Sequence, residues 1–230
     1  MLEQIINQYL KEQEATPHTA SGKFSCGDAK RCHTYRYKKR QGTEALGAFD
    51  DRTLRVFEVG HIFHKWVQDI LSKKGVLLAS EVRVEDEHRA GIIDAIVQSD
   101  GKVILYDLKT VHSGKFTYLK KEDDLHYHYQ AATYTSMYHK NYYRDFEIDE
   151  TRICYISKDD LRIKEVPVLV TPQQLNEDWL PLIVAWDMKQ EPKPNPLPWE
   201  CALGGKSKKA YCPFIETCEH LKEFSQTSKK

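Results

Sequence analysis

Residues 91–109 read GIIDAIVQSDGKVILYDLK, two apolar runs on either side of an Asp-Gly pair. Asp-Gly between apolar runs is a strong signal for a two-residue β-hairpin. Closing the hairpin at this pair places Asp94 opposite Asp107. Side chains alternate between the two faces of a strand, so Asp107 and Lys109 share a face while Leu108 points away. The pattern therefore predicts one sheet face that carries two carboxylates and a lysine.

Two carboxylates on facing positions need a positive partner. Side chains there lie only about 5 Å apart, and like charges at that separation destabilise a sheet. Mg2+ and Mn2+ prefer oxygen ligands from carboxylates together with waters and phosphate, so Asp94 and Asp107 are candidate metal ligands. Lys109 could orient or deprotonate an attacking water. The alternative is a pair of solvated strand ends, and we favour the metal site because both aspartates adjoin apolar runs.

The segment from Phe57 to Leu71 spaces its apolar residues as a buried amphipathic helix does. Gly60 lies one turn before His64 on the same face. A residue without a side chain leaves room there for a neighbouring backbone or a ligand. His64 is therefore a candidate site residue, and a satisfied core or surface histidine is the alternative.

A second helix is predicted to begin near residue 124, in the run LHYHYQAATY. Gln130 and Tyr134 share one of its faces because they are four residues apart. An amide and a phenol so placed could hold a strand of nucleic acid. An aromatic face packed on the sheet explains the pattern as well.

In chain order, these pieces resemble the RecB-like branch of the PD-(D/E)XK nuclease superfamily. Four motifs carry the resemblance, namely Gly60-x-x-x-His64, Gly91-x-x-Asp94, Asp107-x-Lys109 and Gln130-x-x-x-Tyr134. Each motif alone is weak, but four in this order are specific. The third motif departs mildly from the family, which more often has Glu where this chain has Asp107.

The resemblance implies metal-dependent cleavage of DNA phosphodiesters by Asp94, Asp107 and Lys109. It also implies contacts to DNA by Gln130 and Tyr134. The metal, Mg2+ or Mn2+, would be held by four groups, which are His64, Asp94, Asp107 and the Leu108 carbonyl.

Four of the six cysteines form a second clue, one near the N-terminus and three near the C-terminus. Four thiolates hold either structural zinc or an iron-sulfur cluster. The chain looks similar here to the iron-sulfur exonucleases of the same branch, the CRISPR-associated and AddB-type nucleases. That resemblance implies a 4Fe-4S cluster, with zinc left open, on Cys32, Cys201, Cys212 and Cys218. Ten residues separate Cys201 from Cys212, a longer gap than the family's. Cys26 is the alternative to Cys32 as the N-terminal ligand. We interpret both Cys26 and Cys154 as ordinary thiols.

At 230 residues and 40% hydrophobic, the chain can bury one substantial core. We expect a single domain over 1–230, with cluster-binding segments at 24–40 and 199–220. Basic and acidic residues number 34 each, so net charge gives no argument for nucleic acid. Basic residues do gather at 30–40 and 206–209. Convergence of the cysteines would join these two segments into a phosphate-binding patch, and solvated loops are the alternative.

The predicted elements are helices at 2–13, 53–74, 124–141 and 173–188, and strands at 79–86, 90–98, 103–109, 151–157 and 161–168. This order favours an α/β restriction-endonuclease-like core, a mixed central sheet flanked by helices, with a C-terminal iron-sulfur flap. The Pro-rich run at 191–198 is expected to be extended and to return the chain toward Cys32. The sequence shows neither a signal segment nor an apolar run of membrane-span length, so we expect a cytoplasmic protein without a membrane partner.

The motifs and the resemblance together imply an iron-sulfur, Mg2+/Mn2+-dependent DNA exonuclease of recombination, repair, phage DNA processing or CRISPR spacer acquisition. Exonuclease rather than endonuclease activity comes from the resemblance alone. The expected partner is DNA, single-stranded or with free ends, and further candidates are a second copy of the chain or a recombination partner protein. The alternative function is a non-catalytic iron-sulfur or zinc protein that binds DNA or acts as a scaffold. The intact set of Asp94, Asp107 and Lys109 argues against it.

Overall fold

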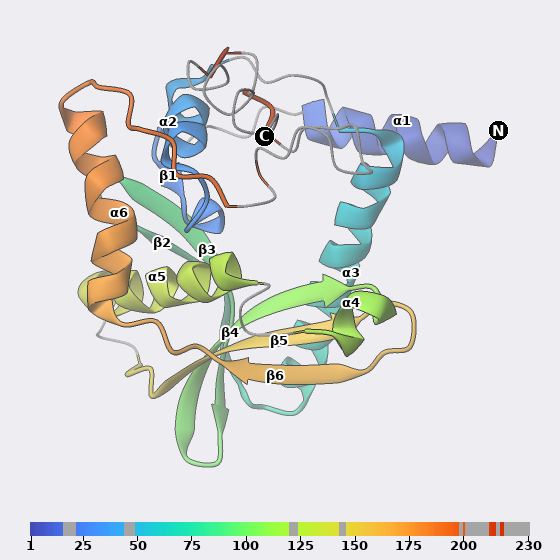
Figure 1. Ribbon diagram of the computed structural model, residues 1–230. Helices are drawn as coiled ribbons and strands as arrows, with labels where there is room; N and C mark the ends of the chain where they lie inside the picture. Colours follow the sequence, from blue (N-terminus) through green and yellow to red (C-terminus); the bar gives the residue numbers. More distant parts are fainter. Residues whose placement is uncertain are drawn as a thin grey trace.

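The computed structural model describes residues 1–15, 22–43, 49–119, 124–142, 146–197, 200, 212–214 and 217–218. Figure 1 shows how the helices and strands of these residues are arranged. The elements up to the first long helix are α1 (Leu2–Ala15), β1 (Phe24–Ser25), a 3-10 turn η1 (Cys26–Asp28), α2 (His33–Gln41) and α3 (Asp51–Lys73). Those that follow are β2 (Leu77–Glu85), β3 (Arg89–Ser99), β4 (Lys102–Val111), α4 (Ser113–Thr117), α5 (Leu125–Tyr142), β5 (Glu150–Ser157), β6 (Ile163–Pro167) and α6 (Pro172–Asp187).

The Asp-Gly pair turns the chain as the sequence predicts. Asp100 and Gly101 both have positive φ, 52° and 76°, the combination that a type I′ hairpin turn requires. The turn joins β3 to β4, which pair antiparallel from Ser99–Lys102 to Ala95–Tyr106. The hairpin and its register are therefore confirmed. The two aspartates of the predicted site are the next residues along these strands, where the ladder ends.

Helices cover both faces of one mixed sheet (Figure 1). Its described strands run in the order β1-β3-β4-β5-β6, and β2 also pairs with β3. The β1–β3 and β4–β5 pairs are parallel and the others are antiparallel. Leu105 packs against α5 and Leu108 against α3, and residues three apart on a strand point to opposite faces. The predicted core, a mixed central sheet flanked by helices, is confirmed.

Helix α3 is amphipathic, but the prediction that it is buried was wrong. Every residue of α3 is described, and Leu54 alone is buried. Trp66 and Ile70 keep 41% and 42% of their surface exposed. Only part of the helix reaches the sheet, where Phe63 and Val67 pack on it. The first turns of α3 contact α1, which crosses them (Figure 1).

The basic segment at 30–40 forms a helix, α2, that the sequence did not indicate. Four of its six cations pair with carboxylates, and the other two, Lys30 and Arg40, lie against aromatic rings. Arg36 is fully buried and lies 3.0 Å from Asp178, while Lys38 lies 3.1 Å from Glu191. Carboxylates of the protein itself therefore neutralise most of the charge of the phosphate-binding patch predicted for this segment. The second half of that patch, 206–209, lies outside the described residues.

The Pro-rich connector returns the chain to the N-terminal segment, as predicted. The Pro192 carbonyl accepts a hydrogen bond from Thr34, and the Asn195 side chain accepts one from the His33 N–H at 2.6 Å. The buried carboxylate of Glu200 then accepts from the Cys32 N–H at 3.1 Å. These contacts fix Pro192, Asn195 and Glu200 against the segment that begins α2. No helix within the described ranges combines the length and apolar composition that crossing a membrane demands.

Candidate active site

The candidate site begins where β3 and β4 separate. One oxygen of Asp94, Oδ2, accepts a hydrogen bond from the Leu108 N–H at 2.7 Å, so a side chain takes the place of the next ladder bond. Its other oxygen lies 3.5 Å from Nδ1 of His64, which reaches the site from α3. A hydrogen bond also links His64 to the Leu108 backbone. The structure therefore brings His64, Asp94 and Leu108 together.

Asp107 and Lys109 complete the group. Lys109 Nζ donates to Asp107 Oδ1 at 2.8 Å. Asp107 is only 1% exposed, and its Oδ2 has no hydrogen-bond partner among the described residues. An unpartnered buried carboxylate oxygen is costly, so it marks a position where a cation would be stabilised.

Burial decides the ionisation of this group. It raises the pKa of both Asp94 and Asp107 to about 6, and the ammonium of Lys109 only partly opposes that rise. Burial lowers the pKa of His64, and the positive charge of Lys109 lowers it further. The imidazole is therefore neutral at pH 7. For Lys109, burial alone would lower the pKa, but the carboxylates of Asp107 and Asp94 outweigh it and leave the pKa raised.

A neutral imidazole and two carboxylates are donors that a divalent cation accepts. Within the described part of the chain, no three His, Cys, Asp or Glu side chains are already arranged as a metal cage. In the site itself, Leu108 N–H and Lys109 Nζ each occupy one carboxylate oxygen. The donor types fit a divalent cation, and the orphaned Asp107 oxygen is the atom best placed to bind one.

We expect the metal-free protein to be less stable at pH 7 than at pH 5. Between pH 4 and 6 the folded state holds protons on Asp94 and Asp107 that the unfolded chain has released, so the free energy of unfolding falls as pH rises through this window. The expected loss is about 2 kcal/mol. Urea unfolding in EDTA at both pH values measures it, and the loss should shrink in Asp107→Asn. An equal loss in both proteins would contradict the assignment.

Gln130 and Tyr134 come together, but inside the protein. Gln130 Nε2 donates to the Tyr134 hydroxyl at 2.7 Å, and the two residues are 8% and 5% exposed. The Tyr134 ring packs with β2, β3 and β4 residues in the core beneath α5. This arrangement matches the alternative of a helix face packed on the sheet. Contact of these two residues with DNA remains a prediction.

The two motif glycines differ in what surrounds them. A Cβ on Gly91 would lie 2.4 Å from Cε1 of Tyr134 and 3.0 Å from Cβ of Cys26, whereas one on Gly60 would meet only Thr110 Oγ1, at 3.7 Å. Overpacking of a buried site costs about 1–3 kcal/mol, so Gly91→Ala should lower the free energy of unfolding by that amount. Gly60→Ala is the matched control and should not destabilise, since alanine favours a helix. Equal stability of the two variants would refute this reading of Gly91.

One further acidic residue approaches the site without having been predicted. Glu81 has a φ of 52° within β2, a left-handed conformation uncommon outside glycine. Gln68 bridges it to the site, since its amide donates to Glu81 Oε1 at 2.6 Å and to the Asp94 carbonyl at 2.9 Å. The negative charge of Glu81 helps to raise the pKa of Asp94. In sequence Glu81 is one polar residue in a strand, with no turn signal to single it out.

The described cysteines lie in three environments, one of which is the cluster of Leu108 and Ile156 that holds Cys154. Cys26 is fully buried in the main core beside Met137, and burial raises the pKa of its thiol to about 12. Cys32 instead packs with Tyr35, Phe214 and Cys212.

Cys218 lies near this second group. Burial raises the pKa of Cys212, and the nearby Cys32 and Cys218 raise it further. Cys32 and Cys218 thus both lie within electrostatic range of Cys212, but the three thiols are not arranged as a metal-binding group in the described residues. The fourth predicted ligand, Cys201, lies outside those residues.

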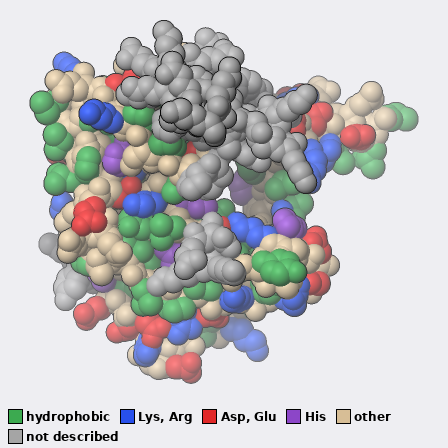
Figure 2. Space-filling view, in the orientation of Figure 1, with side chains coloured by type: hydrophobic (Ala, Val, Ile, Leu, Met, Phe, Trp, Pro, Cys, Tyr) green, Lys and Arg blue, Asp and Glu red, His purple; other side chains and the backbone are tan. Residues whose placement is uncertain are grey.

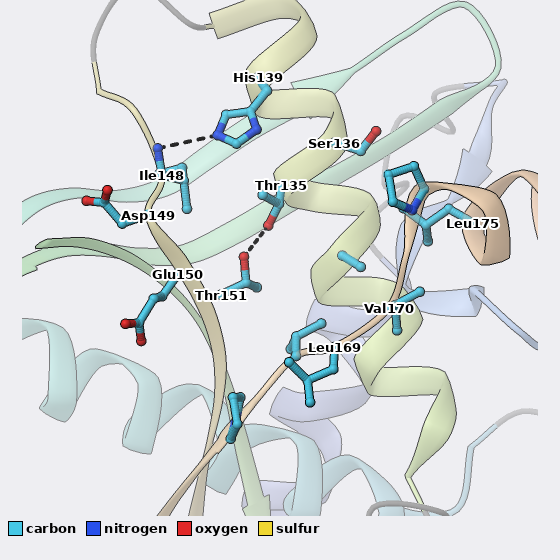
Figure 3. Close-up of a pocket in the computed structure, with 14 residues that line it drawn as sticks. Thr135, Ser136, His139, Ile148, Asp149, Glu150, Thr151, Leu169, Val170 and Leu175 are labelled. Carbon is cyan, nitrogen blue, oxygen red and sulfur yellow. Dashed lines mark hydrogen bonds between the residues drawn. The ribbon is translucent and has the colours of Figure 1, made fainter.

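A separate cavity of about 710 Å³ lies between α5, β5 and the start of α6. Figure 3 shows its polar contacts, where Thr135 lies 2.6 Å from Thr151 and His139 accepts a hydrogen bond from the Ile148 N–H. None of the predicted site residues lines this cavity. The candidate site is therefore a different part of the molecule.

Comparisons with known proteins bear on the fold and the family of the chain. The crystal structure of SSO0001 superimposes with a TM-score of 0.56 at 18% identity, over 95% of this chain and 96% of that one, which shows a shared fold. The crystal structure of an alkaline exonuclease (LHK-Exo) from Laribacter hongkongensis has a TM-score of 0.45 at 10% identity, over 73% and 87%. A search of curated proteins gave no match. The sequence profile of the PD-(D/E)XK nuclease superfamily matches residues 77–219, more than half of the chain. The chain belongs to the PD-(D/E)XK nuclease superfamily.

Proposed function

We propose that this protein is a metal-dependent deoxyribonuclease that hydrolyses phosphodiester bonds at the β3–β4 site. The observation that carries the proposal is the pairing of the partly buried Asp94 with the buried Asp107 beside Lys109, with one Asp107 oxygen left unpartnered among the described residues. Membership of a nuclease superfamily supports it. The proposed catalytic residues are those three.

The side chains of His64, Asp94 and Asp107, with the Leu108 carbonyl, would hold Mg2+ or Mn2+. When bound, such a cation supplies charge stabilisation at the phosphate and lowers the pKa of a coordinated water. The chain prepares the site for it in two ways. His64 is kept neutral, so a ring nitrogen can act as a ligand. Gln68 fixes the backbone of Asp94 through its carbonyl.

Lys109 is the residue that would act on the reacting groups. Its ammonium is kept charged and is held by Asp107 at 2.8 Å, so it can donate hydrogen bonds to the phosphate or orient the attacking water. In the space-filling view, Lys, Arg and His side chains gather around the hollow at the centre of the face shown (Figure 2). Positive charge there suits a polyanionic substrate.

End-dependent cleavage is the finer part of the proposal and rests on the sequence resemblance to exonucleases. It is tested with the same labelled DNA in linear and circular form, each incubated with Mn2+ and, as a control, with EDTA. We expect the linear strands to shorten from an end while circles persist. Cleavage of circular DNA would overturn the exonuclease assignment but leave the nuclease assignment standing. Intact DNA in every reaction would overturn both assignments.

A 4Fe-4S cluster on Cys32, Cys201, Cys212 and Cys218 is the second part of the proposal. The proximity of Cys32, Cys212 and Cys218 supports it. Its ligands come from opposite ends of the chain, so the cluster would pin the C-terminal segment to α2 and add to the folding free energy. If the purified protein is colourless and contains one zinc, the iron assignment is wrong and the four-cysteine site is a zinc site. We place the activity in DNA recombination, repair or processing.

A further inference from the structure

Tyr127, in the first turn of α5, lies beside the lysine on which the proposed function depends. The Nζ atom of Lys109 is 4.8 Å from the centroid of the Tyr127 ring. The same ammonium donates to Asp107 Oδ1 at 2.8 Å. The catalytic lysine is therefore in contact with a carboxylate and an aromatic ring at once.

Neighbouring groups fix the position of that ring. The Tyr127 N–H donates to the Asp124 carbonyl at 2.9 Å, and the His126 ring centroid lies 3.9 Å from that of Tyr127. Lys115, from α4, is 5.7 Å from the Tyr127 ring and 2.6 Å from Asp124 Oδ1. Asp124 itself is only 1% exposed. Asp124 thus anchors the backbone of Tyr127 through its carbonyl and a second cation near the ring through its buried carboxylate.

We propose that Tyr127 is a positioning residue, whose ring face holds the Lys109 ammonium toward the reacting phosphate. A lysine ends in a compact charge on a flexible four-carbon stem, so one hydrogen bond to Asp107 leaves its head free to swing. The negative face of an aromatic ring attracts an ammonium within about 6 Å. The ring supplies the second restraint, and the hydroxyl of Tyr127 has no part in it. This inference rests on the proposed function.

The first test compares Tyr127→Leu with Tyr127→Phe in the full chain, using end-labelled DNA and Mn2+. Leucine keeps apolar bulk and removes the π face, so kcat should fall about tenfold with KM changed less than threefold. Phenylalanine keeps the ring, so kcat should stay within about twofold of the wild type. Inactive wild-type protein would overturn the proposed function instead, which separates the two failures.

Three other results would overturn the inference while the wild type remains active. The first is an unchanged kcat in Tyr127→Leu. The second is a raised KM with normal kcat in that variant, which would make the ring a DNA contact. The third is an equal loss of kcat in both variants, which would make the hydroxyl the active group. If Tyr127→Leu does not fold, fluorinated phenylalanines at position 127 decide the question, because fluorine weakens the negative ring face with little change of shape. We expect kcat to fall stepwise with each added fluorine. A flat series would refute the role of the ring.

Discussion

Replacing Asp107 by alanine should abolish DNA cleavage, lowering kcat by at least about a thousandfold. The substitution removes the carboxylate with the unpartnered oxygen and also the group that holds Lys109 at 2.8 Å. Both proposed roles at the site, binding the cation and placing the lysine, are lost in one change. The measurement is the single-turnover rate on end-labelled DNA with Mn2+.

The loss should be chemical and not a failure to fold. At pH 7 the Asp107 carboxylate is buried above its raised pKa of about 6 and therefore destabilises the metal-free protein, which offsets the partner that Lys109 loses. We expect unchanged far-UV circular dichroism. Asp149→Ala is the matched control, an exposed aspartate that accepts a hydrogen bond from Val103 N–H at the other end of β4. It should cleave as the wild type does.

Replacing Cys32 by alanine should remove the cluster and produce the largest loss of stability among the variants considered. Cys32 lies at the start of α2, where Glu200 binds its N–H and Cys212 packs beside it. Loss of the cluster would leave the two ends of the chain joined only by such contacts. We expect brown wild-type protein with roughly four irons per chain, a colourless variant, and a melting temperature lowered more than by Asp107→Ala.

Cys26→Ala is the control for this experiment. Its thiol is buried in the core against Met137 and Gly91, so the variant should keep its iron and lose only packing energy. A Cys32→Ala protein that retains its full cluster would show the cluster assignment to be wrong and would point to Cys26 as the ligand.

The hairpin could be predicted because local chemistry determines it. Asp100 and Gly101 tolerate positive φ, and apolar runs on both sides fix the register. Those two facts alone place Asp94 beside Asp107. The nuclease motifs around them follow from the same short stretch of sequence.

The features that could not be predicted depend on distant parts of the chain. The burial of α3 is one, since periodicity shows which face is apolar but not how far the sheet extends beneath it. The helix α2 is another, because Arg36 becomes tolerable in the interior only beside Asp178, far along the sequence. The same holds for Glu81, whose link to Asp94 runs through Gln68 of α3.

The central claim is that the β3–β4 site cleaves DNA only with a divalent cation. The most direct measurement adds Mn2+ to EDTA-treated wild-type protein already bound to end-labelled DNA, and follows the products with time. We predict no products before the addition and prompt shortening of the strand after it. The Asp107→Ala protein should give no products at any time. Cleavage that starts before Mn2+ is added, or that persists in Asp107→Ala, would contradict the assignment of this site.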